Sequence, residues 1–136
     1  MDKHTIHAVQ QWMLKADHDL RSALKLKTPD SNEPLLDTAV YHCQQTAEKA
    51  LKAYLTANEV SFPKTHLLLP LLELCIDIDS SFSNLTDAAE LLTPFATEFR
   101  YPGDILEPTP SDTDEAYKMA EHVLIFIRSK FKINSL

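Results

Sequence analysis

The sequence predicts an all-α protein, an up-and-down helical bundle of four main helices plus one short helix. Glycine occurs once in 136 residues, and the tight turns of a β-sandwich or barrel need many glycines. Apolar residues recur at spacings of three and four through long segments, as in helices with one buried stripe. Short proline-containing connectors separate these segments. We therefore expect one domain spanning residues 1–136.

The first helix is predicted from about Asp2 to Lys27. Lys25 and Lys27 lie in its last turn, where the helix dipole favours cations, and Thr28 and Pro29 end it. Its buried stripe consists of Ile6, Val9, Met13, Ala16, Leu20, Ala23 and Leu24.

The second helix is predicted from a cap at Asp30 or Ser31 to about Asn58, with Pro34 in its first turn. Its apolar stripe is rich in alanine, which lets neighbouring helices approach closely, so this helix should be central. Cys43 falls in the stripe and is predicted to be an inert buried thiol. The opposite, predicted solvated face holds Asp37, Thr38, Tyr41, His42, Gln44, Gln45, Glu48, Lys49 and Lys52, with Leu55 as an apolar exception.

The third, short helix is predicted from a Thr65 cap to about Ile76, with Pro70 near its start. A polar link over residues 77–84 should follow it.

The fourth helix is predicted over about 86–99, with a kink or a new first turn at Pro94. The last helix is predicted to begin with a capping box of Ser111 and Asp114 and to run to the end of the chain.

Charge and composition exclude several classes of function. Thirteen Lys and Arg against twenty Asp and Glu give a formal charge of −7, which disfavours a global electrostatic grip on nucleic acid, and we expect no DNA partner. Residues 1–27 carry five Lys or Arg and three Asp, so a local basic strip is compatible with the sequence. One glycine excludes Walker A, GxGxxG and GxSxG loops.

The cellular context follows from what the sequence lacks. Two cysteines do not make a disulfide framework. There is no apolar run of 18 residues and no basic-then-apolar leader, so we expect a cytoplasmic protein without a membrane partner. Six histidines invite a metal hypothesis, but no Glu-x-x-His pair occurs. We expect neither a metal nor a cofactor.

Four motifs resemble one family. The run from Tyr41 to Leu55 resembles the aromatic-His-x-Gln-Gln-x-x-Glu-Lys-x-Leu-Lys-Ala signature of HEPN domains. Residues 12–20 are similar to the opening W-x-x-x-A-x-x-D-L, residues 63–68 to the P-x-T-H-x-L connector, and residues 99–104 to the x-R-Y-P-x-D loop. The matches follow the family's order and cover nearly the whole chain.

The resemblance implies a helical bundle that commonly forms a homodimer. Many HEPN domains belong to two-gene modules with a minimal nucleotidyltransferase, often as toxin and antitoxin. The RNase branch of the family cleaves RNA without metal through Arg-x(4–6)-His. None of Arg21, Arg100 and Arg128 has a histidine at that spacing, so no catalytic residue is assigned.

The candidate ligand-binding residues lie on the second helix and in two loops. His42, Gln45, Lys49 and Lys52 follow 3-4-3 spacing and should form one strip able to hold a phosphate or an RNA backbone. The alternative is a solvated face in which Glu48 pairs with Lys52. The loops add His66, Arg100, Tyr101 and Asp104, although Arg100 could instead cap the fourth helix.

The leading prediction is a non-nucleolytic HEPN module that binds a nucleotide, RNA or a minimal nucleotidyltransferase. One alternative is a divergent metal-independent RNase toxin. The other is a purely structural dimerisation or interaction domain.

Overall fold

The computed structural model describes residues 1–30, 32–97 and 107–131. Within these ranges the chain is helical and contains no strand, which confirms the predicted fold class. The five α-helices are α1 (Lys3–Lys27), α2 (Leu36–Ala57), α3 (Leu68–Ile78), α4 (Thr86–Leu92) and α5 (Pro110–Lys130). Two 3₁₀ helices, η1 (Ser80–Leu85) and η2 (Thr93–Ala96), flank α4.

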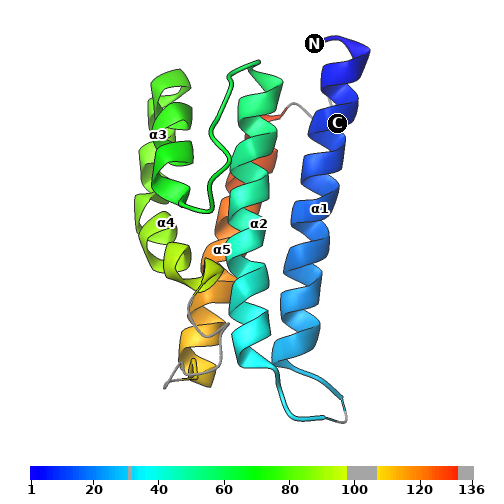
Figure 1. Cartoon of the computed structure of the whole chain (residues 1–136), viewed down its shortest axis with the longest axis vertical. Helices are drawn as coiled ribbons and strands as arrows, with labels where there is room; N and C mark the ends of the chain where they lie inside the picture. Colours follow the sequence, from blue (N-terminus) through cyan, green and yellow to red (C-terminus); the bar gives the residue numbers. More distant parts are fainter. Residues whose placement is uncertain (31, 98–106, 132–136) are drawn as a thin grey trace.

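Helix α2 is the centre of the bundle, as the alanine-rich stripe predicted. It contacts α1, α3, α4, η2 and α5, and Figure 1 shows it between α1 on one side and the α3–α4 pair on the other. Ala39, Ala50 and Ala53 are fully buried. Small side chains at these positions let neighbouring helices approach closely.

Helix α1 has the predicted bounds within one residue. The Asp2 carboxylate accepts a hydrogen bond from the Thr5 amide at 2.8 Å, which caps the N-terminus. The Thr28 amide donates to the Leu24 carbonyl and ends the helix.

The predicted start of α2 at Asp30 or Ser31 is wrong, because the helix begins at Leu36 and has no side-chain cap. The Leu35 amide donates to the Leu26 carbonyl at 2.9 Å, at the end of α1. That bond fixes the reversal between two antiparallel helices, so Pro34 lies in the turn and outside the helix.

Helix α3 begins at Leu68, three residues after the predicted cap. Thr65 accepts from the Leu67 amide instead of capping the helix, and the Leu68 amide donates to the Thr93 hydroxyl at 3.3 Å. Tertiary contact with η2 therefore sets the start of α3. Pro70 lies in the first turn, as predicted.

The segment predicted as a polar link contains η1. The Asp79 carboxylate accepts hydrogen bonds from the Ser81 amide and hydroxyl at 3.0 and 2.7 Å, and Phe82 is fully buried. The expectation of a plain link is wrong, because Phe82 anchors this turn in the core.

The α-helix ends at Leu92, so the expectation of one α-helix through Pro94 is wrong, whereas the new turn expected at Pro94 is present as η2. Proline lacks an N–H and its ring clashes with the carbonyl four residues earlier, so the chain tightens into η2.

The predicted capping box of α5 lies two residues too late. Thr109 and Asp112 bond reciprocally to each other's backbone amides, with Pro110 as the first helical residue. Asp114 instead forms an ion pair with Lys27 at 2.8 Å.

The central position of α2 gives a stability prediction. Replacing Ala50, which is fully buried, with Asp should lower the free energy of unfolding by ~3 kcal/mol or more, because a carboxylate would be buried without a partner. Gln11→Asp, at an exposed position of α1, is the matched control and should be nearly neutral. Thermal unfolding followed by circular dichroism measures both, and equal melting temperatures would contradict the central placement of Ala50.

Candidate functional site

The polar face of α2 is largely buried, which contradicts the prediction of a solvated face. Gln44, Gln45, Glu48 and Lys52 are between 0 and 9% exposed. The connector from α2 to α3 runs back along α2 and covers this side (Figure 1). Leu55, the apparent apolar exception, is fully buried. The helix is thus enclosed on more sides than its hydrophobic periodicity indicated.

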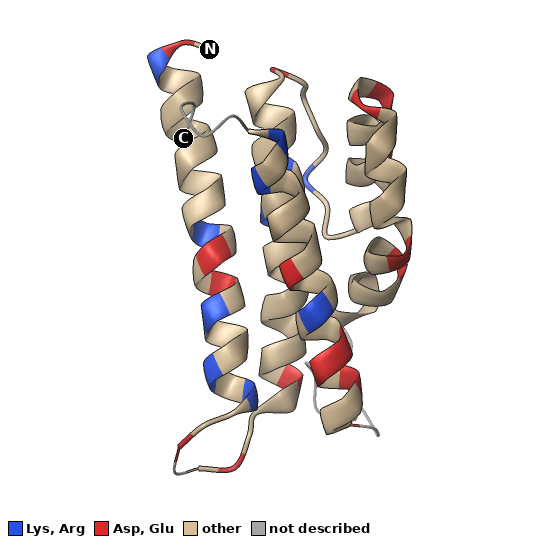
Figure 2. Cartoon of the chain, turned by 180° about the vertical axis from the view of Figure 1, so that it is seen from behind, with Lys and Arg blue, Asp and Glu red and all other residues tan. Residues whose placement is uncertain are grey.

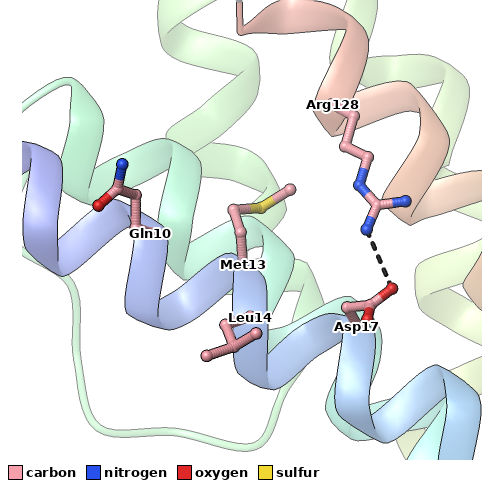
Figure 3. Close-up of a pocket in the computed structure, with 5 residues that line it drawn as sticks. All are labelled: Gln10, Met13, Leu14, Asp17 and Arg128. Carbon is pink, nitrogen blue, oxygen red and sulfur yellow. Dashed lines mark hydrogen bonds and ion pairs between the residues drawn. The ribbon is translucent and has the colours of Figure 1, made fainter. Parts of the chain in front are cut away.

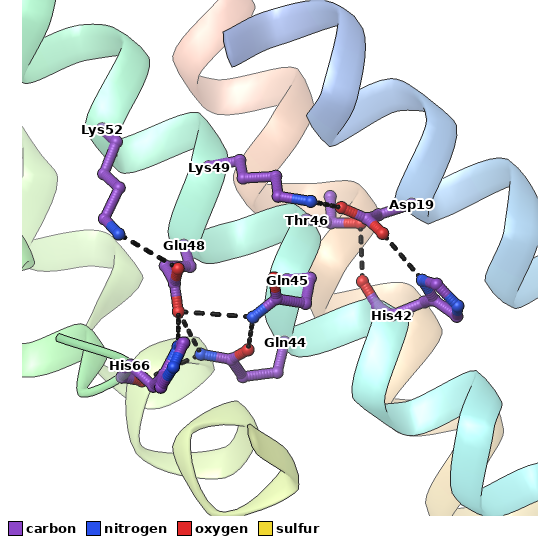
Figure 4. Close-up of polar contacts among 9 residues, drawn as sticks. All are labelled: Asp19, His42, Gln44, Gln45, Thr46, Glu48, Lys49, Lys52 and His66. Carbon is purple, nitrogen blue, oxygen red and sulfur yellow. Dashed lines mark hydrogen bonds and ion pairs between the residues drawn. The ribbon is translucent and has the colours of Figure 1, made fainter. Parts of the chain in front are cut away.

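Glu48 is the centre of the first polar cluster (Figure 4). Its Oε1 accepts hydrogen bonds from Gln44 at 3.2 Å, Gln45 at 3.4 Å and His66 Nδ1 at 2.9 Å. Its Oε2 accepts from Lys52 Nζ at 3.1 Å, the ion pair expected as the structural alternative. Gln44 also donates to the His66 carbonyl at 2.9 Å, so two contacts hold the connector to α2.

Lys52 is enclosed by aromatic rings as well as by Glu48. Its Nζ lies 5.6 Å from the ring centroid of Trp12 and 5.8 Å from that of Phe62. The two rings meet edge to face at 6.3 Å. Cation–π attraction and the ion pair together satisfy this ammonium group.

Asp19 of α1 is the centre of the second polar cluster. Its Oδ1 lies 2.7 Å from His42 Nδ1, and its Oδ2 accepts from Lys49 Nζ at 2.6 Å. The carboxylate side chain is 10% exposed. These bonds join α1 to α2 across the longest helix interface of the bundle.

Both carboxylates are ionised at neutral pH. Burial acts to raise the pKa of Asp19, but the hydrogen bonds from His42 and Lys49 outweigh it and hold the pKa below its ordinary value. Burial likewise acts to raise the pKa of Glu48, and the bonds from His66, Gln44 and Lys52 lower it overall. Neither group can serve as a general acid at neutral pH.

The predicted strip on α2 therefore divides into two neutralised halves. His42 and Lys49 bond to Asp19, while Gln45 and Lys52 bond to Glu48. In the described part of the chain, no buried side-chain nitrogen or oxygen lacks a hydrogen-bond partner. The strip is a set of internal contacts and does not present two free cations to a phosphate.

His66 is the one predicted loop residue that the structure describes. Its side chain is 67% exposed, although Nδ1 bonds to the buried Glu48. Because an ionised carboxylate only accepts, Nδ1 carries a proton. The other three, Arg100, Tyr101 and Asp104, lie outside the described residues.

The sequence did not predict that Asp19 and Gln44 take part in these two polar clusters. Asp19 belongs to the opening motif that resembled the HEPN family, which was its only signal. Gln44 was assigned to solvent, and the chain covering it is 22 residues away in sequence.

Other chemistry is limited in the described residues. Cys43 and Cys75 are free and fully buried, and burial raises the pKa of each thiol to about 12. The prediction of an inert Cys43 thiol is consistent with this. The described part holds no group of three His, Cys, Asp or Glu side chains arranged for a metal ion. None of its helices is long and apolar enough to cross a bilayer.

The fold and the two buried clusters define the class of protein. It is an all-α bundle in which the charged side chains of the central helix are paired with other side chains inside the protein. The family model for the HEPN domain matches residues 9–130. The chain therefore belongs to the HEPN domain family, and this confirms the resemblance of the four motifs.

Solved structures agree with the family assignment. The crystal structure of an archaeal HEPN homologue is similar at 25% identity with a TM-score of 0.70, over 91% of this chain and 98% of that one. A Thermus thermophilus protein is similar at 26% identity and a TM-score of 0.70, over 90% and 98% of the two chains. No curated protein matches the chain significantly.

Removing the charge of Glu48 should destabilise the protein. Glu48→Gln should lower the free energy of unfolding by ~3 kcal/mol, because the Lys52 ammonium loses the carboxylate that balances its charge and His66 loses its anionic hydrogen-bond acceptor. Glu73→Gln, at an exposed site on α3, is the matched control. Urea unfolding at pH 7 measures both, and equal midpoints would show that Glu48 adds no net stability.

Acid should lower the stability of the folded protein, because it protonates the Glu48 carboxylate. Because folding lowers the pKa of Glu48 from 4.5, its stabilisation is complete above pH 4.5 and is lost as the pH falls through the lower folded-state pKa. The free energy of unfolding of Glu48→Gln should therefore fall less on acidification than that of the wild type. Parallel acid dependences would contradict this assignment.

Proposed function

We propose that this protein is a non-nucleolytic HEPN module that acts by binding a partner protein. The observation that carries the proposal is a contrast between two surfaces. The cations predicted to bind phosphate are already paired with Asp19 and Glu48. An apolar groove beside the connector, by comparison, is open to solvent.

The groove lies between the start of α3 and the end of α4. It has a volume of about 270 Å³ and is lined by Leu67, Leu69, Pro70, Glu90, Thr93 and Pro94. Leu67 is 56% exposed and Leu69 is 37% exposed, and exposed apolar groups that gather in a hollow are typical of protein contacts. The exposed Glu90 adds a negative charge at this groove.

The residues around the groove are held firmly. Leu68 is fully buried between its two exposed neighbours, and its amide bonds to Thr93 across the groove. His66 is tied to Glu48 directly before this segment. A preorganised groove loses little conformational entropy on binding. It fits an apolar side chain that has a Lys or Arg nearby to meet Glu90.

The HEPN resemblance makes a separately encoded minimal nucleotidyltransferase the partner to test first, as in a toxin–antitoxin pair. A homodimer is the other assembly that the resemblance implies. Light scattering of the purified protein measures the homodimer separately, and the groove variants below distinguish the two occupants.

A second candidate function has one observation in its favour. His66 is an exposed imidazole whose Nδ1 is oriented by a buried carboxylate, the arrangement that suits a general base. The divergent RNase alternative would use this histidine. It lacks a described partner acid, since His42 is bonded to Asp19 and Glu48 is ionised.

Partner binding gives the first functional prediction. Leu67→Asp and Leu69→Asp should each weaken binding of the proposed partner, a separately encoded minimal nucleotidyltransferase, by at least about tenfold, since each puts a charge in an apolar contact. Ile78→Asp, 38% exposed at the far end of α3, is the control. Isothermal titration with both purified proteins measures the change. Equal affinity for all four proteins would exclude the groove as the contact.

The proposed lack of nuclease activity gives the second functional prediction. The purified protein should not cleave single-stranded RNA, because no histidine follows an arginine at the spacing of the RNase branch. Gel analysis of a labelled RNA measures cleavage. Cleavage that disappears in His66→Ala would replace the binding proposal with the RNase alternative, whereas cleavage that persists in that variant would point to another nuclease.

A further inference from the structure

His66 is the one exposed histidine of the described chain whose ring is oriented by a carboxylate. All six histidines lie in the described ranges, and only His42 and His66 come within ion-pair distance of an Asp or Glu there. The His42 side chain is 27% exposed, and His42 shares Asp19 with Lys49. The His66 side chain is 67% exposed, while its partner Glu48 is buried. His66 therefore combines a fixed ring with access from solvent.

The contacts of His66 leave its Nε2 atom free. Nδ1 donates to Glu48 Oε1 at 2.9 Å, since an ionised carboxylate can only accept. The backbone of the same residue is held by Gln44, which donates to the His66 carbonyl at 2.9 Å. With the proton on Nδ1, the lone pair of a neutral imidazole is on Nε2, directed away from the buried carboxylate. In the described part of the chain, Nε2 has no hydrogen bond or ion pair.

The other exposed histidines do not share this arrangement. Those that form no ion pair with a carboxylate in the described residues are His4, His7, His18 and His122. Asp17, next to His18 in sequence, pairs instead with Arg128 at 3.1 Å. The described residues that line the hollow of about 300 Å³ beside this pair include no histidine or cysteine (Figure 3). These histidines can therefore serve as internal standards for the reactivity of His66.

The surroundings of His66 favour a negative group on its exposed side. His66 comes two residues before Leu68, the first residue of α3, and the N-terminal end of a helix carries a partial positive charge. Between residues 60 and 67 the connector has one lysine, Lys64, which is exposed, and no Asp or Glu. Figure 2 shows this stretch beside α2. A phosphoryl group on Nε2 would thus be attached to a connector without acidic residues, at the start of a helix.

From this geometry, we propose that Nε2 of His66 is a nucleophile that accepts a phosphoryl group from a small phosphodonor of the phosphoramidate or acyl-phosphate class. Histidine is one of the side chains that form covalent intermediates, and neighbouring groups activate it. A carboxylate on Nδ1 makes the other ring nitrogen more basic. The same carboxylate balances the positive charge that the ring acquires when Nε2 attacks.

The transfer step balances with the groups that are present and the donor. The Nε2 lone pair forms a bond to phosphorus while the bond from phosphorus to the leaving group breaks. With phosphoramidate, both electrons of the broken bond go to nitrogen, and the leaving group departs as ammonia with the protons that it already carries. The proton on Nδ1 stays on the ring, so the product is a phosphoimidazolium paired with the Glu48 carboxylate. Nothing is oxidised or reduced.

This inference is independent of the groove and of the RNase alternative. It needs neither a partner protein nor RNA, because its product is a covalent adduct of this chain. A failure of nucleotidyltransferase binding would leave it standing, and so would the absence of RNA cleavage.

The test is reaction of the purified protein with phosphoramidate at about pH 8, where imidazole side chains are ordinarily neutral. Peptide mass spectrometry measures the rate at which each histidine gains about 80 Da, the mass of one phosphoryl group. His66 should react at least about tenfold faster than His18 and His122, and phosphorus NMR should place the group on Nε2. Equal rates for these three histidines, or a group on Nδ1 of His66, would overturn the proposal.

Glu48→Gln tests the carboxylate as a positioning group, and Glu73→Gln, at an exposed site on α3, is the matched control. The ratio of the His66 rate to the His122 rate is compared within each sample. Glu48→Gln should lower this ratio at least about tenfold, as for other carboxylates that orient a functional histidine, and the NMR spectrum should now show a group on Nδ1 as well. Glu73→Gln should leave both unchanged. Because Glu48→Gln is also destabilising, the comparison of histidines in the wild type decides the proposal even if this variant does not fold. An unchanged ratio in the folded variant would overturn it.

Discussion

Burial of the Glu48 carboxylate is the constraint on which the surrounding structure depends. An ionised group removed from water is costly unless donors replace its hydration, and four side chains do so here. One of them, His66, comes from the connector. The connector must therefore return along α2, and its path positions the Leu67–Pro70 segment, whose contact with η2 starts α3. A buried charge on the central helix thus determines the shape of a surface groove.

The Asp19 cluster constrains how α1 packs against α2. The contact surface of α2 is rich in alanine, and small, similar side chains specify axial register weakly. A carboxylate that accepts from His42 and Lys49 is satisfied in one register. Buried ion pairs add less stability than apolar packing, and their best-attested value is this kind of specificity.

The net charge of the chain conceals two surfaces of different character. Acidic groups gather on α3, α4 and the first half of α5, whereas the exposed side of α1 is basic. Exposed Leu67 and Leu69 lie on the α3 side of the molecule, away from the basic helix. The apolar groove and the basic side of α1 therefore belong to different elements of the bundle.

The sequence by itself determined the helical class, the family and the central position of α2. Each follows from local information: the scarcity of glycine, the three-and-four spacing of apolar residues, and motifs in a fixed order. Where local chemistry was decisive, as in the Asp2 cap of α1, the predicted boundary was right.

Only the tertiary structure decided what the polar residues of α2 do. Periodicity assigned Gln44 and Glu48 to solvent because the helix was considered alone, while a connector distant in sequence buries them. The same cause moved the starts of α2 and α3, since the Leu35 and Leu68 amides bond to groups on other elements. A residue pattern reports which side chains can pair, but their actual partners depend on which segments the fold brings together.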